Sequence, residues 1–141
     1  MKTQIILDTN FLLIPGQFKV DIFSEIERLC SFSYELCIMQ GTEQELRKIT
    51  LKKDEKGANK TAAKIGLKLV EDKKVKEIEF ESLTDCDAND VDSKILQYCG
   101  QQKGKTECIV ATQDAELAKK LRIAGIRLIR LRKLQYLEIT Q

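Results

Sequence analysis

Residues 3–8, TQIILD, are a short apolar run that ends in an acid. A run of this length, bounded by polar residues, is typical of a strand that is buried in a parallel sheet. Further strands are predicted at 35–39, 75–80, 106–112 and 126–131, and the tail at 134–139 can add a short edge strand. Together these segments predict a mostly parallel sheet of four to five strands.

Apolar residues recur at helical spacing in the segments between these strands. The first helix is predicted at 21–30, with Asp21 as its N-cap. A second begins near Thr42, which has capping-box spacing to Glu45. Gly57 is expected to separate that helix from the next one, and Pro15 is expected in a loop after the first strand. Three more helices are predicted at 59–72, 91–99 and 114–125.

Strands that alternate with helices, without repeats or linkers, predict one α/β domain over residues 1–141. With 43% hydrophobic and 33% charged residues, the composition is that of a soluble globular domain. The sequence contains no signal-peptide pattern and no apolar run of about 18 residues, the length that a membrane span needs. We therefore expect a cytoplasmic protein without a membrane partner.

The absence of histidine excludes several kinds of chemistry. It removes histidine acid–base catalysis, Cys–His and Ser–His–Asp nucleophiles, and most zinc sites. The five cysteines form no CxxC motif, and most of them lie among apolar neighbours, which predicts reduced thiols in the core. Carboxylates, hydroxyls, lysines or a bound metal must therefore carry any reaction.

Acids follow several of the predicted strands. Asp8 ends the first strand, Glu45 lies in the first turn of the helix after the second, and Asp114 directly follows the fourth. Asp90 and Asp92 lie where the helix after the third strand begins. Ligands of open parallel sheets bind at the carboxyl ends of the strands, so these acids are expected at one edge.

Each acid also has a purely structural explanation, because carboxylates at helix N-termini cap free N–H groups. Asp8 is the exception, since Thr9 and Asn10 follow it and no helix is predicted there. A calcium loop over 85–96 is excluded, because its sixth position is Asp90 instead of glycine. Hard carboxylate oxygens without histidine or cysteine favour one or two Mg²⁺ or Mn²⁺ ions.

The net charge of +2 conceals a strongly polarised chain. Residues 46–70 carry eight bases and two acids, residues 71–92 carry three bases and nine acids, and residues 117–133 carry seven bases and no acid. Two basic segments that flank an acidic one predict a surface for a nucleic-acid backbone. The side chains expected to bind it are Lys48, Lys52, Lys60, Lys64, Lys68, Lys119, Lys120 and Arg122.

Four stretches resemble the PIN-domain nucleases in their order and spacing: ILDTN (6–10), TEQELRKI (42–49), VDSKIL (91–96) and IVATQDAEL (109–117). The resemblance covers nearly the whole chain. It implies a three-layer α/β/α sandwich and a metal-dependent endoribonuclease that leaves 5′-phosphate and 3′-hydroxyl ends. By position, Asp8, Glu45, Asp92 and Asp114 match the metal-binding acids, Thr112 and Asn10 match supporting polar residues, and Asp90 could share the role of Asp92.

Within this family, residues 8–29 look most like the archaeal relatives of the PIN nucleases of the small-subunit processome. That branch implies ribosomal RNA or its precursor as substrate, and the family resemblance implies a homodimer. The alternative is a VapC-like toxin ribonuclease, which would have an antitoxin partner. Two further alternatives are a non-catalytic RNA-binding assembly factor and a phosphoacceptor receiver domain.

Overall fold

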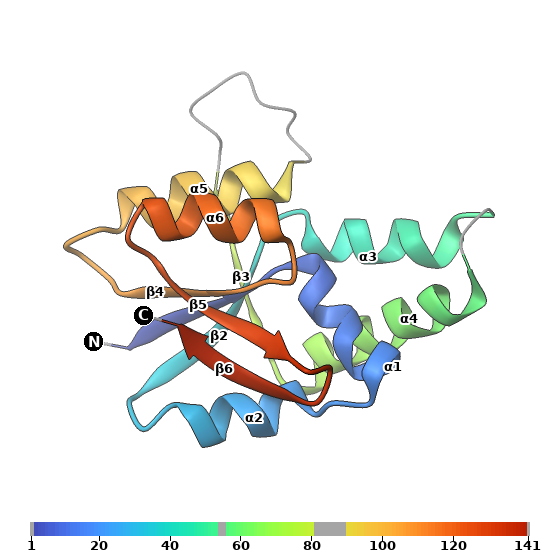
Figure 1. Ribbon diagram of the computed structural model, residues 1–141. Coiled ribbons are helices and arrows are strands. Elements are labelled where there is room, and N and C mark those ends of the chain that lie inside the picture. Colours follow the sequence, from blue (N-terminus) through green and yellow to red (C-terminus); the bar gives the residue numbers. More distant parts are fainter. Residues whose placement is uncertain (1, 54–55, 81–89, 141) are drawn as a thin grey trace.

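The computed structural model describes residues 2–53, 56–80 and 90–140. Its strands form one six-stranded sheet in the order β3-β2-β1-β4-β5-β6 (Figure 1). The first five strands are parallel and β6 runs antiparallel to β5. The strands are β1 (Thr3–Leu7), β2 (Tyr34–Met39), β3 (Lys76–Ile78), β4 (Cys108–Ala111), β5 (Arg127–Arg132) and β6 (Tyr136–Thr140).

Helices cover both faces of the sheet. They are the 3₁₀-helix η1 (Thr9–Leu13) and the α-helices α1 (Ile14–Phe18), α2 (Ile22–Leu29), α3 (Thr42–Leu51), α4 (Gly57–Asp72), α5 (Val91–Gln101) and α6 (Ala115–Ile123). Figure 1 shows α5 and α6 on one face, α2 on the other, and α3 and α4 as a hairpin that projects from the sheet. Among the described residues, no helix has both the length and the apolar character that crossing a membrane requires.

Each face of the sheet packs against its own hydrophobic cluster, because successive strand residues point to opposite sides. Ile6, Val110 and Leu128 pack under α5 and α6. Ile5 and Ile109 point the other way, into the cluster that includes η1, α1, α2 and α4. The predicted α/β/α sandwich is therefore confirmed, and the tail expected at an edge supplies the sixth strand.

The strand order reverses between β1 and β4, which are direct neighbours in the sheet. This order differs from 2-1-3-4-5, the order of the flavodoxin-like fold that receiver domains share. The receiver alternative is therefore excluded. The reversal also places the carboxyl ends of β1 and β4 side by side, where a ligand site of an open parallel sheet is expected.

The segment after Asp8 is helical, which the sequence did not predict. The Asp8 carboxylate accepts a hydrogen bond from Thr9 N and caps η1, so our expectation that Asp8 caps no helix was wrong.

Pro15 was expected in a loop, but it lies in the first turn of α1, where its missing N–H is no loss. The predicted capping box between Thr42 and Glu45 is wrong, because Gly41, at φ 104°, is the N-cap of α3 and Thr42 is already helical. Gly57 is the first residue of α4 and not a separator.

Two glycines allow α4 to pack directly against η1 and α1. A Cβ atom on Gly16 would lie 2.5 Å from Ala62 Cα, and one on Gly66 would lie 2.7 Å from the carbonyl oxygen of Leu12. Both distances are shorter than real Cβ contacts, so only glycine fits at either position. This contact holds the segment that follows Asp8 in place.

Candidate functional site

Asp8 lies at the end of β1, at the reversal of strand order, and is only 2% exposed. Its backbone N–H donates to Ala111 O over 2.9 Å, which continues the pairing of β1 with β4. Its carboxylate accepts from Thr9 N over 2.9 Å and from the Thr112 hydroxyl over 2.7 Å. Burial raises the pKa of Asp8 to about 6, although both hydrogen bonds act to lower it.

Polar groups after β4 are tied to those after β1. The Thr112 hydroxyl that donates to Asp8 also accepts from Asp114 N over 3.0 Å. Asn10 Oδ1 accepts from Gln113 N over 3.0 Å, and the Gln113 side-chain amide donates to Asn10 O over 3.2 Å. Asn10 therefore acts as a brace between the two strand ends. No pattern in the sequence pointed to Gln113.

Asp114 caps α6, as the sequence allowed. Its Oδ1 atom accepts from Glu116 N over 2.9 Å and from Leu117 N over 3.2 Å. Its charge also acts on two neighbours, because it raises the pKa of both Asp8 and Asp92. Asp114 therefore serves as a helix cap and as one member of an acidic group.

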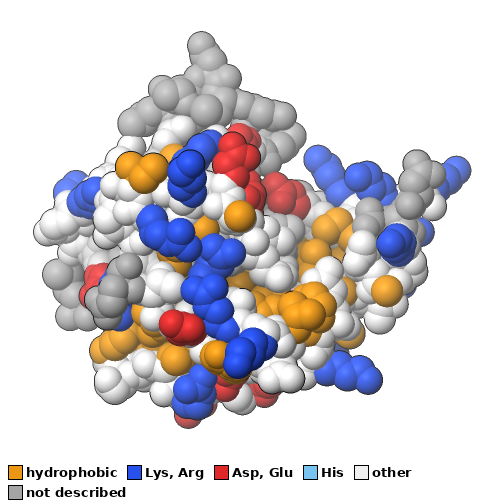
Figure 2. Space-filling model, viewed as in Figure 1, with side chains coloured by type: hydrophobic (Ala, Val, Ile, Leu, Met, Phe, Trp, Pro, Cys, Tyr) orange, Lys and Arg blue, Asp and Glu red, His pale blue; other side chains and the backbone are white. Residues whose placement is uncertain are grey.

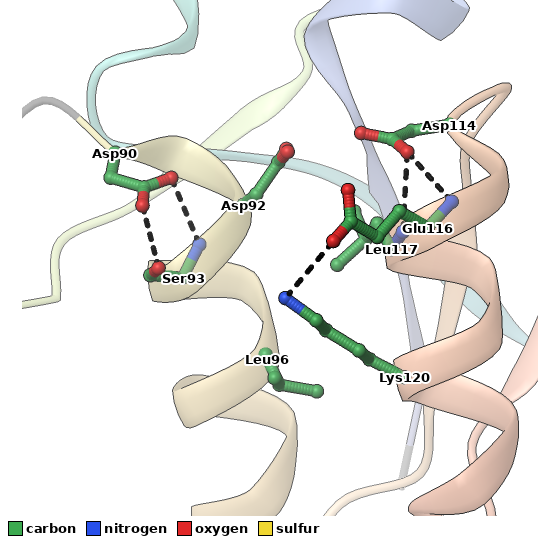
Figure 3. A pocket seen from close by; sticks show the side chains of 8 residues that line it. All are labelled: Asp90, Asp92, Ser93, Leu96, Asp114, Glu116, Leu117 and Lys120. Atoms are coloured by element: carbon green, nitrogen blue, oxygen red, sulfur yellow. Dashed lines mark hydrogen bonds and ion pairs between the residues drawn. The ribbon is translucent and has the colours of Figure 1, made fainter.

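Asp90 and Asp92 have different environments although only Val91 separates them. The Asp90 carboxylate turns back to Ser93, accepting from its N over 3.2 Å and from its hydroxyl over 2.6 Å, and the hydroxyl bond lowers the pKa of Asp90. Asp92 points from α5 toward Asp114 (Figure 3). Burial raises the pKa of Asp92 to about 7, and the charges of Asp8 and Asp114 add to this shift. The geometry therefore favours Asp92 over Asp90 as the residue that joins Asp8 and Asp114 in the acidic group.

The acids line two adjoining hollows that share Asp90 and Asp92. One lies between α5 and α6, where Asp114, Glu116 and Lys120 face it (Figure 3). The other is lined by Asp8, Thr9, Asn10, Leu13, Glu45 and Ile49. Glu45 reaches this second hollow from the first turn of α3, and its charge raises the pKa of Asp8. Asp8, Glu45, Asp92 and Asp114 thus gather from four remote segments.

Of the predicted RNA-binding side chains, Lys120 alone lines these hollows within the described chain. It lies 4.0 Å from Glu116, and its charge helps to lower the pKa of Asp90. Lys119 and Arg122 are exposed on α6, outside the hollows. The other five are on the α3–α4 hairpin, which projects from the sheet (Figure 1), and none of them lines either hollow. They are Lys48, Lys52, Lys60, Lys64 and Lys68, of which Lys68 pairs with Asp72 at 4.0 Å.

The chemistry of this acidic group fits a hard divalent cation. Its donors are carboxylate oxygens, which Mg²⁺ and Mn²⁺ prefer. Burial raises the pKa of both Asp8 and Asp92, and the charges of neighbouring carboxylates add to the shift, so a cation among them would favour the ionised forms. Within the part of the chain that the structure describes, no three acidic or cysteine side chains already converge as an ion cage.

The fold and the site define a class: α/β/α proteins whose acids meet at the carboxyl ends of two central parallel strands. Residues 5–134 match the family model of the PIN like domain. The chain therefore belongs to this family, and the membership predicted from the sequence is confirmed.

Two known proteins resemble the chain over nearly its whole length. Ribonuclease VapC4 of Methanocaldococcus jannaschii is 33% identical over 136 residues, which are 96% of this chain and 95% of that protein. The solved structure of the PIN domain endonuclease Utp24 matches with a TM-score of 0.73 at 23% identity, covering 96% of this chain and 90% of that one. At this identity, the structural likeness supports the fold alone.

Proposed function

We propose that the protein is a metal-dependent endoribonuclease that hydrolyses RNA phosphodiester bonds. The observation that carries the proposal is the meeting of Asp8, Asp92 and Asp114 at the reversal of strand order, where the pKa of the first two is raised. The family and the similarity to Ribonuclease VapC4 support the reaction and the substrate class.

In this proposal, Asp8, Asp92 and Asp114 hold Mg²⁺ or Mn²⁺, and Glu45 is a further ligand or orients the attacking water. A bound ion there lowers the pKa of water and neutralises charge on the phosphate oxygens. Thr112 holds the Asp8 carboxylate through the 2.7 Å hydrogen bond, and Asn10 braces the loop that carries Asp114. Because Asp8 and Asp92 hold protons more tightly than ordinary aspartates, ion binding must release protons near neutral pH.

The test is cleavage of end-labelled single-stranded RNA with Mn²⁺, with Mg²⁺ and with a chelator. We expect cutting with either metal, 5′-phosphate ends on the products, and no cutting by Asp8→Asn. Asparagine keeps the size and shape of the side chain and one acceptor oxygen, but its amide group replaces one of the two oxygens that accept from Thr9 N and the Thr112 hydroxyl. Wild-type protein that binds RNA tightly but never cuts it would favour the non-catalytic assembly factor.

The substrate has two proposed origins. The sequence pattern favours ribosomal RNA or its precursor, and the 33% identity to Ribonuclease VapC4 supports a toxin-type ribonuclease with an antitoxin partner. Expression in a heterologous host separates them. Growth arrest by wild-type protein but not by Asp8→Asn supports the toxin, whereas altered ends of precursor ribosomal RNA without arrest support the processing enzyme. Light scattering tests the expected homodimer.

A further inference from the structure

Three arginines gather beside the acidic group, on the side away from the α3–α4 hairpin. Arg130 and Arg132 alternate with buried residues along β5 and point to the face that also holds Leu128 under α6. Arg122 comes from α6, and its charge acts directly on Arg130. We call Arg122, Arg130 and Arg132 the arginine cluster.

The cluster adjoins the acids through the pairing of β4 with β5. Ala111 pairs with Ile129, and Thr112 N donates to Ile129 O over 3.4 Å, so Arg130 follows directly beside Thr112. The charge of Asp114 also acts on Arg130 and favours its protonated form. Figure 2 shows lysine and arginine side chains in a column that starts beside the acids and runs over α6 and the β5–β6 hairpin.

The cluster lacks enough acids to balance it. Arg132 Nε lies 3.3 Å from Glu138 Oε2, whereas Arg122 and Arg130 form no ion pair with an acid in the described ranges. Partial burial lowers the pKa of Arg130, and the like charges of Arg122 and Arg132 add to this. Three arginines on adjoining elements, with one ion pair to an acid among them in the described residues, are typical of a site for an anion.

We propose that the arginine cluster binds the phosphate backbone of the RNA strand next to the bond that is cut, with Arg130 as its central contact. A guanidinium fork matches two phosphate oxygens, which a lysine ammonium cannot do. The proposal rests on the proposed nuclease function, because RNA is the polyanion which that activity brings to the acids. According to this proposal, RNA binds mainly along β5 and α6, whereas the sequence analysis also expected RNA contacts from the lysines of α3 and α4.

The experiment measures RNA binding without cleavage. Asp8→Asn, which is expected to bind but not cut, is titrated with Mg²⁺ present into a fluorescent single-stranded RNA of about 16 nucleotides. Adding Arg130→Ala should weaken binding about tenfold and reduce the salt dependence by about one phosphate contact. Arg130→Lys keeps the charge without the fork and should fall between the two.

Lys105→Ala is the matched control. It removes the same charge from an exposed turn between α5 and β4, at the opposite ends of the strands, and should leave the Kd unchanged. Equal Kd values for Arg130→Ala and Lys105→Ala would overturn the proposal, as would wild-type cleavage with a KM that Arg130→Ala does not raise. If wild type never cuts RNA but Arg130→Ala still weakens binding, the nuclease proposal fails and the arginine cluster stands. Thermal unfolding of Arg130→Ala and Arg130→Lys at the wild-type temperature excludes a folding defect as the cause.

Discussion

Helices α2 and α5 begin with the same kind of N-cap, but α2 packs against the core whereas α5 also carries a member of the acidic group. Asp21 and Asp90 have the same N-cap torsions, φ −80° and ψ 92°, and each carboxylate accepts from the N–H and hydroxyl of a serine three residues later. The second helical residue differs. In α2 it is Phe23, which is buried in the core, and in α5 it is Asp92, whose pKa is raised to about 7. The N-cap sets where each helix begins, whereas the second helical residue determines whether the helix contributes to the acidic group.

The sharpest test of this comparison separates Asp92 from Asp90. Asp92→Asn should reduce metal-dependent cleavage by more than about a hundredfold. Mutating a residue that only hydrogen-bonds a metal ligand already lowers metal affinity or activity by about 10–100-fold. Asp90→Asn should stay within a few-fold of wild type, because asparagine caps helices as well as aspartate does. The measurement is kcat with Mn²⁺. Equal losses in both variants would mean that Asp90 also acts at the ion.

The next test concerns the hydroxyl that holds Asp8. Thr112→Val keeps the side-chain shape but removes the 2.7 Å hydrogen bond to Asp8, and should cost about 10–100-fold in activity at fixed Mn²⁺. Thr112→Ser restores the hydroxyl and should recover most of that loss. If the serine variant is as impaired as the valine variant, the methyl group and not the hydroxyl is what the site needs.

Stability without metal should depend on pH in opposite directions at the two kinds of aspartate. The folded-state pKa of Asp8 and Asp92 is raised, so metal-free protein should lose stability as pH rises from about 4 to about 7. Asp8→Asn should therefore gain about 2 kcal/mol in the free energy of unfolding at pH 8. The lowered pKa of Asp21 has the reverse effect, giving stability that is lost as pH falls through that pKa. Urea titrations in chelator measure both when they run from pH 8 to below the ordinary aspartate pKa of about 4. A profile that Asp8→Asn does not flatten would contradict the expectation.

The smallest expected effect lies in the caps themselves. Asp21→Ala and Asp90→Ala should each cost about 1 kcal/mol of stability, since each loses the same pair of hydrogen bonds to serine. Urea unfolding at pH 7 measures the two costs side by side. A much larger cost at one helix would show that its aspartate does more than cap.

The sequence predicted those parts of the site that follow from position along a strand. Asp8 and Asp114 were expected at one edge because both follow parallel strands, and parallel strands end on the same side. The place of β4 beside β1 and the hydrogen bond from Thr112 to Asp8 come from contacts between residues more than 100 positions apart. Spacing along the chain carries no information about such contacts.

Other parts depended on where an element points. Lys60, Lys64 and Lys68 do repeat at helical spacing, but spacing gives their shared face and not its direction, and none of them lines the hollows that hold the acids. Arg130 and Arg132 belong to the basic segment 117–133, but the pattern did not distinguish them from its other bases. Their place beside Thr112 follows only from the register of β4 with β5. The helical segment after Asp8 was missed because its first turn is held by Asp8 itself.

The long separation between Asp8 and Thr112 also has a consequence in time. A ribosome makes Asp8 near the start of the chain and its hydroxyl partner 104 residues later. At roughly 5–20 residues per second, several seconds pass between the two. Because Asp92 and Asp114 also come late, the nascent chain has no complete set of acids until Asp114 has been made. A protein that cuts RNA would thus stay harmless to its own messenger and ribosome before that point.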